Sequence, residues 1–223
     1  RVKAAVNRVC YDEKTGLFDN GFWGSTAIAT CVGILDDSIH QKVIEYMVND
    51  IRKEAHRLFV GFTGTRHILQ ALAMNGYIDD ALEMVIQPEY PGYGNIVRRG
   101  ATTLWESWNG ANSRNHIIRG YVSAFMYRYL AGISPAAPGF TKIRFAPQFP
   151  QKLDWVRAEY ETKQGMLRSA WEKRNGKITC NFEIPAGATA DIVLPGKELH
   201  NATGKVEITV GIRARDARRS EPG

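Results

Sequence analysis

The spacing of the apolar residues changes once along this chain, at a segment rich in Pro, Gly and Ala, residues 131–139. Before that segment, apolar residues recur every three or four positions, as on one face of a helix. After it they alternate with polar residues, which is typical of half-buried strands. The change of period predicts an α + β multidomain chain, with a helical domain over residues 1–131 and a strand domain over residues 132–212.

The helical part is predicted to consist of paired helices. Residues 23–34 are apolar nearly all round, which favours a buried inner helix, whereas residues 39–53 carry one apolar face and suit an outer position. The pattern repeats with an inner helix from the Gly61 segment to Met74 and an outer helix over residues 77–86. With a first helix over residues 2–9 and a last one over residues 112–130, about six helices describe half of an (α/α)6 toroid. Half a toroid cannot close by itself.

The second part is predicted to be an antiparallel β-sandwich. Asn175-Gly176 between two alternating runs is a strong hairpin signal. The charged segment 213–223 lacks apolar periodicity, and we expect a disordered tail there. The predicted strands cover residues 142–145, 155–162, 166–173, 177–184, 190–194 and 205–210.

Composition excludes several classes of partner. The net charge of +6 over 223 residues is scattered, with no basic stripe between aromatic residues, so we expect no nucleic-acid partner. No apolar run is long enough to span a bilayer, so we expect no membrane segment. The 3 cysteines are far apart and predict neither a disulfide framework nor a metal-ligand pair. The chain opens without Met inside a helical pattern, which suggests a fragment and leaves the compartment open.

One short segment carries the chemistry. Glu106 stands between Trp105 and Trp108, on a stretch that begins at Gly100 and ends at Gly110. Indole faces stack on pyranose rings, and a carboxylate between them suits a sugar site. The alternative is that the two tryptophans, at i and i+3, are core residues and that Glu106 faces solvent. The spacing alone leaves both interpretations open.

The same segment resembles a known family. The run Gly-Ala-Thr-Thr-Leu-Trp-Glu-Ser-Trp (residues 100–108), with Tyr-Pro-Gly-Tyr-Gly before it and Asn-His after it, is similar to the end of the catalytic domain of bacterial-type α-L-rhamnosidases. Residues 61–65, 138–140 and 146–147 also match, so the resemblance spans about residues 11–195. It implies hydrolysis of terminal α-L-rhamnose with inversion, with Glu106 as the general base and His116 in contact with the rhamnose.

Inverting hydrolysis needs a second carboxyl group, roughly 6.5–9.5 Å from the first, as general acid. The acids that precede Glu106 are predicted to lie in turns or on outer helix faces. In the family the general acid lies earlier in the catalytic domain, so this chain is expected to hold the base half of a site, to need the missing N-terminal part of that domain as a partner, and to be inactive or nearly so alone. Further candidates for substrate contact are Trp108, Trp105, Asn115, Phe62 and Tyr93, the last two placed in turns.

Two departures from the family pattern leave the preferred rhamnoside open: Ser107 stands where an arginine is common, and Arg114 where an apolar residue is usual. No His, Cys or Asp cluster has metal-ligand spacing, so we expect no catalytic metal and no cofactor, with calcium on loop carboxylates left open. Two other functions stay open: another (α/α)6 glycosidase or phosphorylase, and a non-catalytic carbohydrate-binding protein.

Overall fold

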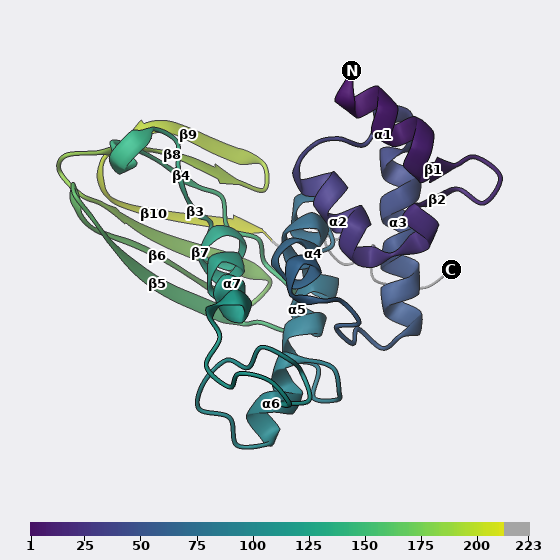
Figure 1. Ribbon diagram of the computed structural model, residues 1–223. Helices are drawn as coiled ribbons and strands as arrows, with labels where there is room; N and C mark the ends of the chain where they lie inside the picture. The colour runs from purple at the N-terminus through teal and green to yellow at the C-terminus, as the bar shows by residue number, and fades with distance from the viewer. Residues whose placement is uncertain (212–223) are drawn as a thin grey trace. The chain divides into compact units, whose positions relative to one another are not determined.

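The computed structural model describes residues 1–211 and has helices followed by β-sheets, which confirms the predicted fold class (Figure 1). Contacts between Cα atoms divide the chain into two compact units, residues 1–122 and residues 123–223. We call them the helical unit and the β unit. The tail predicted at residues 213–223 lies outside the described residues. No helix within residues 1–211 combines the length and the apolar character needed to cross a membrane.

The helical unit contains six α-helices and a small hairpin, β1 (Tyr11–Asp12) with β2 (Leu17–Phe18). A seventh helix, α7 (Tyr121–Phe125), begins at its end. The six helices are α1 (Val2–Cys10), α2 (Trp23–Cys31), α3 (Asp37–Lys53), α4 (Phe62–Met74), α5 (Ile78–Ile86) and α6 (Tyr93–Arg98).

Helices α2 and α4 pack directly against each other, as predicted for inner helices. A Cβ atom added at Gly64 would lie 3.1 Å from the Cα atom of Gly24, so the two backbones meet where neither residue has a side chain. Helix α3 buries only one face, made of Val43, Ile44, Met47, Val48 and Ile51. The contrast between a small-residue helix buried nearly all round and a one-faced helix is the predicted alternation of inner and outer positions.

The prediction of one helix over residues 112–130 was wrong. Residues 101–116 form an irregular loop, followed by a 3-10 turn (Ile117–Gly120), the short α7 and a π-helical turn (Met126–Leu130). Residues up to 116 are not helical because their backbone groups pair across the loop: Glu106 N–H donates to Ser113 O, and His116 N–H donates to Leu104 O. Helix α6 was not predicted, and Phe62 and Tyr93, predicted in turns, are the first residues of α4 and α6.

The β unit holds two four-stranded sheets. Their strand orders are β10-β7-β6-β5 and β3-β4-β8-β9. The strands are β3 (Ile133–Pro135), β4 (Lys142–Phe145), β5 (Trp155–Thr162), β6 (Gly165–Arg174), β7 (Lys177–Ile184), β8 (Thr189–Leu194), β9 (Lys197–Ala202) and β10 (Gly204–Gly211).

The sheets differ from the prediction in one pairing. Strands β4 and β8 run parallel, whereas an antiparallel sandwich was expected throughout. The reason is connectivity: β5, β6 and β7 separate these strands in sequence and belong to the other sheet, so no hairpin fixes their direction. Strands β3 and β9 were missed because β3 is short and ends at a proline, and β9 is mostly exposed and lacks alternation.

The core of the β unit lies between its two sheets. Phe145 of β4 and Phe182 of β7 meet with ring centroids 4.7 Å apart. Trp171 of β6 is buried, and its Nε1–H donates to Leu130 O at 2.7 Å, so the last helical turn is bonded to the sheets. The predicted hairpin joins β6 to β7 through Asn175 and Gly176, both with positive φ.

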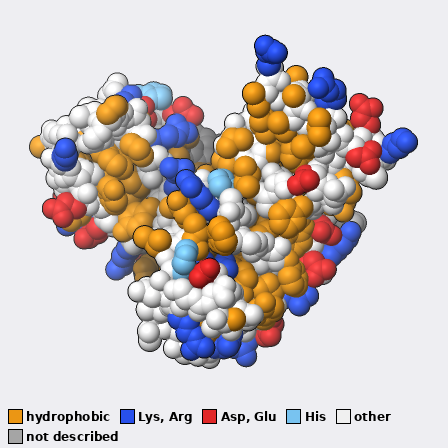
Figure 2. All heavy atoms as spheres, in the orientation of Figure 1, with side chains coloured by type: hydrophobic (Ala, Val, Ile, Leu, Met, Phe, Trp, Pro, Cys, Tyr) orange, Lys and Arg blue, Asp and Glu red, His pale blue; other side chains and the backbone are white. Residues whose placement is uncertain are grey.

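Large apolar side chains are exposed on the helical unit. Phe22, Phe59, Phe62 and Ile117 all have exposed fractions above 40%. Figure 2 shows broad apolar areas on the visible face of the helical elements. Extended apolar surface of this kind is typical of places where further polypeptide packs.

Candidate active site

Glu106 lies on the irregular segment of residues 101–116, here called the Glu106 loop, between α6 and the 3-10 turn. Gly100 and Gly110 both have positive φ, which only glycine adopts without strain. At Gly110 the space is also closed, since an added Cβ atom would lie 2.8 Å from the ring of Trp105. Both glycines therefore let the chain turn at the ends of the segment, and Gly110 does so against the Trp105 ring.

Backbone hydrogen bonds across the loop fix Glu106, and a bond of the same kind fixes His116. Glu106 N–H donates to Ser113 O at 2.8 Å, and Ser113 N–H donates to the carboxylate atom Oε2 of Glu106 at 3.3 Å. His116 N–H donates to Leu104 O at 2.8 Å. Glu106 is half-buried, and within the described residues its Oε1 atom has no hydrogen-bond partner. One carboxylate oxygen is held and the other is available to a ligand.

The ring of His116 is oriented by a backbone bond. Its Nδ1 atom accepts a hydrogen bond from Ile118 N–H at 3.2 Å, as the cap of the 3-10 turn. A neutral imidazole that accepts at Nδ1 carries its hydrogen on Nε2. The half-buried His116 therefore presents Nε2–H as a donor, which suits a sugar hydroxyl.

Both tryptophans of the loop are buried, with exposed fractions of 5% for Trp105 and 7% for Trp108. The guanidinium carbons of Arg99 and Arg114 lie 4.9 and 5.0 Å from the Trp105 ring centroid. These contacts leave little of the Trp105 ring for a ligand.

Trp108 is covered in a similar way. Its ring meets Tyr93 edge-on, with centroids 5.1 Å apart, and the Arg119 guanidinium lies 3.4 Å from its centroid. Its indole Nε1–H is buried and has no hydrogen-bond partner within the described part of the chain. Trp108 is thus a packed residue with one unused donor.

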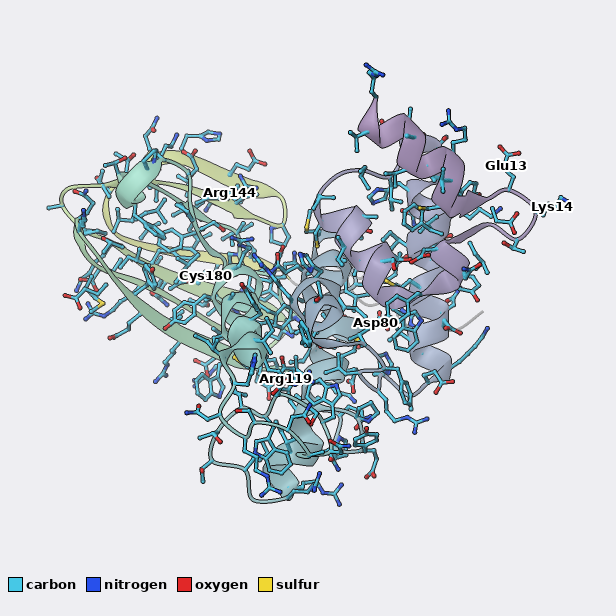
Figure 3. All side chains as sticks on the ribbon, in the orientation of Figure 1. Glu13, Lys14, Asp80, Arg119, Arg144 and Cys180 are labelled. Carbon is cyan, nitrogen blue, oxygen red and sulfur yellow. The ribbon has the colours of Figure 1, made fainter. Side chains whose placement is uncertain are left out.

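Sequence reasoning missed Arg119, which lies where the chain leaves the Glu106 loop for α7 (Figure 3). Its exposed fraction is 3%, and it donates to Trp105 O at 2.9 Å, Glu106 O at 2.7 Å and Thr65 Oγ1 of α4 at 3.2 Å. Burial lowers its pKa to about 10, so the guanidinium is charged at neutral pH.

Within the described residues, the Arg119 guanidinium donates hydrogen bonds only to neutral groups. Within residues 1–211 no carboxylate oxygen lies within salt-bridge distance of it. The Tyr93 hydroxyl donates to Arg119 O at 2.9 Å, and burial raises the pKa of this tyrosine. A sequence signal did exist, because Arg119 is the one Lys, Arg, Asp or Glu between Arg114 and Arg128.

The remaining predicted residues lie around the same loop. Asn115 is exposed on it, and its N–H donates to Ser113 Oγ at 3.3 Å. Phe62 is half exposed and lies one helical turn before Thr65, the α4 residue that Arg119 contacts. The structure therefore gathers α4, α6 and the Glu106 loop around Arg119.

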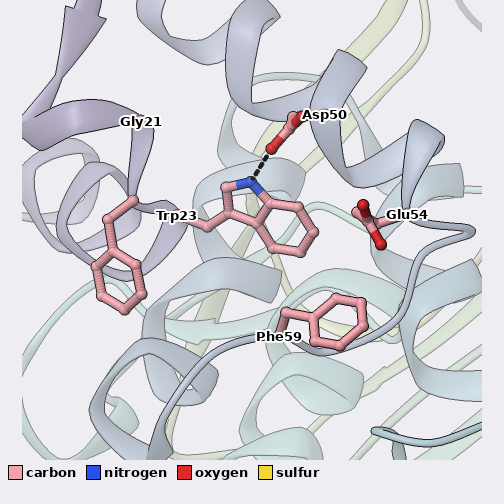
Figure 4. Close-up of a pocket in the computed structure, with 6 residues that line it drawn as sticks. Gly21, Trp23, Asp50, Glu54 and Phe59 are labelled. Atoms are coloured by element: carbon pink, nitrogen blue, oxygen red, sulfur yellow. Dashed lines mark hydrogen bonds between the residues drawn. The ribbon is translucent and has the colours of Figure 1, made fainter.

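A separate hollow of about 370 Å³ opens beside the start of α2 (Figure 4). Its lining includes Trp23, Phe59, Asp50 and Glu54, and the Trp23 Nε1–H donates to Asp50 Oδ2 at 2.9 Å. Glu54 accepts from Arg57 at 3.2 Å. Both carboxylates already have protein partners, so this hollow is a weaker candidate for chemistry than the Glu106 loop.

The buried carboxylate Asp80 is structural. Burial raises its pKa, but hydrogen bonds from His56 and Arg52 outweigh that effect and the net pKa is lowered. Arg52 donates to both oxygens, at 2.8 and 3.0 Å, which joins α5 to α3. An ionised, fully paired carboxylate is unsuited to act as a general acid. Within residues 1–211 no three His, Cys, Asp or Glu side chains are grouped closely enough to hold a metal ion.

Both parts of the chain match models of known protein domains. Residues 1–130 match the model of the bacterial α-L-rhamnosidase 6-hairpin glycosidase domain, and residues 132–209 match that of the bacterial α-L-rhamnosidase C-terminal domain. The chain belongs to the bacterial α-L-rhamnosidase family. The resemblance seen in residues 100–116 is thereby confirmed.

Individual α-L-rhamnosidases agree with this assignment. An α-L-rhamnosidase of Streptomyces avermitilis is 26% identical over 175 residues, which make up 74% of this chain and 17% of that protein. The crystal structure of the Aspergillus terreus α-L-rhamnosidase has the same fold, with a TM-score of 0.88 at 24% identity over 94% of this chain and 26% of that one.

A second crystal structure also shares the fold. The Streptomyces avermitilis α-L-rhamnosidase complexed with L-rhamnose has a TM-score of 0.82 at 22% identity, covering 94% of this chain and 22% of that one. The chain therefore spans only about a fifth of the length of its α-L-rhamnosidase relatives.

Proposed function

We propose that this chain supplies the base half of an α-L-rhamnosidase active site, which hydrolyses terminal α-L-rhamnose with inversion. Glu106 is the general base: its carboxylate takes a proton from a water molecule that attacks the anomeric carbon from the face opposite the leaving group. The product is then β-L-rhamnose. In this proposal residues 1–131 are the C-terminal half of the catalytic domain and residues 132–212 a β-sandwich domain.

The observation that carries the proposal is the state of the Glu106 carboxylate. Oε2 is fixed by Ser113 N–H, Oε1 has no partner in the described residues, and no cation lies within salt-bridge distance there. A base needs this combination, a fixed orientation with an oxygen left to accept a proton. Family membership supports the same role, since the relatives are named α-L-rhamnosidases.

The other predicted residues take supporting roles. His116 donates from Nε2 to a rhamnose hydroxyl, and the exposed Asn115 and Phe62 contact the sugar from the loop and from the start of α4. Trp105, Trp108 and Tyr93 are buried, so only the edges of their rings contact the substrate.

The general acid is proposed to lie upstream, in the part of the catalytic domain that the relatives carry and this chain does not. The exposed apolar side chains of the helical unit support such a partner, because they suit packing against further helices. The chain alone is then inactive or nearly so.

The test is release of p-nitrophenol from p-nitrophenyl α-L-rhamnopyranoside by the chain alone and by the same chain extended upstream to the length of its relatives. We expect activity only from the extended protein. Glu106→Gln should lower kcat by about 100- to 10,000-fold, the usual contribution of a general base. Glu89→Gln, an exposed glutamate paired with Arg98, is the matched control and should retain activity.

Two other results would contradict different parts of the proposal. Activity of the short chain that depends on Glu106 would place the general acid among the carboxylates described here. Rhamnose binding that survives Glu106→Gln, with no hydrolysis by either protein, would favour the non-catalytic carbohydrate-binding function.

A further inference from the structure

Within residues 1–211, Arg119 is a buried cation without a carboxylate partner, and its hydrogen bonds converge on the backbone that carries Glu106. Two of its three bonds end on the carbonyl oxygens of Trp105 and Glu106, at 2.9 and 2.7 Å. Desolvating a guanidinium is costly, and neutral carbonyls compensate for it less well than a carboxylate does. The chain nevertheless buries a charge at this position.

The third bond fixes Arg119 to a rigid element. Its Nη1 atom donates to Thr65 Oγ1 on α4, and Thr65 is itself buried and donates to Gly61 O at 3.0 Å. Helix α4 packs on α2 through glycine contacts. The guanidinium thus links the packed helix α4 to the Glu106 loop, which contains no helix or strand.

Aromatic contacts hold the guanidinium plane in place. It lies 3.4 Å from the ring centroid of Trp108, and the Tyr93 hydroxyl at the start of α6 donates to the Arg119 carbonyl. The planar fork of arginine can bond two carbonyls and a hydroxyl while stacking on an indole, which a lysine ammonium cannot do. Each contact restricts the position of residues 105–108 relative to α4 and α6.

We propose that Arg119 is the positioning residue of the general base: it sets where the Glu106 carboxylate stands without touching the substrate. The proposal rests on the proposed function of Glu106. Displacing a catalytic group by about 1 Å can cost as much as 100-fold in rate, so a residue that fixes the loop backbone acts on kcat. The guanidinium bonds none of His116, Asn115 and Phe62, the residues proposed to contact the sugar, so KM should change less than kcat.

The test is a double-mutant cycle in the extended protein, with the same rhamnoside assay. Arg119→Met should lower kcat about 10- to 100-fold with KM within about 2-fold, and Arg119→Lys should be intermediate. In a Glu106→Ala background, Arg119→Met should cause no further loss, because the base it positions is gone. The control is Arg66→Met, an exposed arginine 4.4 Å from the Tyr121 ring centroid, which should keep wild-type kinetics.

Circular dichroism and the thermal unfolding midpoint show how much of each variant is folded, and kcat is calculated per folded molecule. If Arg119→Met does not fold, Arg119→Lys and Thr65→Val, which removes one acceptor of Arg119, enter the same cycle. Failure of all three to fold would reduce Arg119 to a purely structural role and overturn the proposal. A wild-type kcat in folded Arg119→Met, or a loss that multiplies in the Glu106→Ala background, would also overturn it while leaving Glu106 as the base. Full activity of Glu106→Ala would instead reject the proposed function.

Discussion

At the scale of single residues, Asp80 shows how charge stabilises the helical unit. It is the one buried carboxylate among the described residues, and Arg52 and His56 bond to it. Since its folded pKa lies below the unfolded value of about 3.9, its ionised form stabilises the fold above that pH, and this stability is lost as pH falls through the folded pKa.

Asp80→Asn should therefore lower the free energy of unfolding at pH 7 by about 2 kcal/mol, and the loss should shrink below about pH 4. Urea unfolding of both proteins across pH 3–7 measures it. Glu89→Gln, in an exposed ion pair with Arg98, should cost roughly 0–1 kcal/mol. An equal loss from the two substitutions, or a loss that is constant with pH, would disprove this account of Asp80.

Single residues also show what the sequence could and could not predict about the site. Glu106 and His116 stand in a recognisable run, so their candidacy needed no structure. The partners of Arg119 at positions 65, 105 and 106 follow no helical or strand spacing, and their meeting depends on how α4 and an irregular loop pack. The burial of the two tryptophans was one of two open alternatives because spacing does not reveal which groups cover a ring.

At the scale of elements, Gly132 joins the last helical turn to β3 at a point with no room for a side chain. Its φ is +74°, and an added Cβ atom would lie 2.1 Å from Pro147 N. Gly139 has a similar φ of +65° but nothing within 4 Å of its added Cβ atom. Substituting Gly132 and Gly139 in turn therefore separates two effects on stability: that of a side chain on a left-handed backbone, and that of a steric clash.

Gly139→Ala should destabilise the chain by about 1 kcal/mol, the usual cost of the left-handed region. Gly132→Ala should cost about 3 kcal/mol or more, because backbone must also move. Urea unfolding followed by circular dichroism measures both. Similar losses for the two would mean that the contact between residues 132 and 147 is not tight in solution.

Helices and strands also differ in how well they can be predicted from their sequences. Helices α2 to α5 and the Asn175 hairpin follow apolar period and turn chemistry closely. The parallel pairing of β4 with β8 does not, because it is set by the packing of two sheets rather than by a local turn. The 3-10 and π-helical turns after residue 116 were also missed, since apolar period alone cannot distinguish them from an α-helix.

At the scale of the whole molecule, the helical unit and the β unit each match a domain of bacterial α-L-rhamnosidases, and the chain covers about a fifth of its relatives. The order of the two folds was predictable because the period of the apolar residues changes once. We propose that the activity belongs to a larger protein, in which an upstream part supplies the general acid that acts with Glu106.

The central claim is that Glu106 acts as the base of an inverting reaction, and azide tests it most directly. Azide attacks the anomeric carbon without losing a proton, so it needs no general base, while the general acid still protonates the leaving oxygen. In the extended protein, azide should raise the rate of Glu106→Ala on p-nitrophenyl α-L-rhamnopyranoside and yield β-L-rhamnopyranosyl azide, identified by proton nuclear magnetic resonance. The absence of any rate increase, or an azide product of α configuration, would contradict the account.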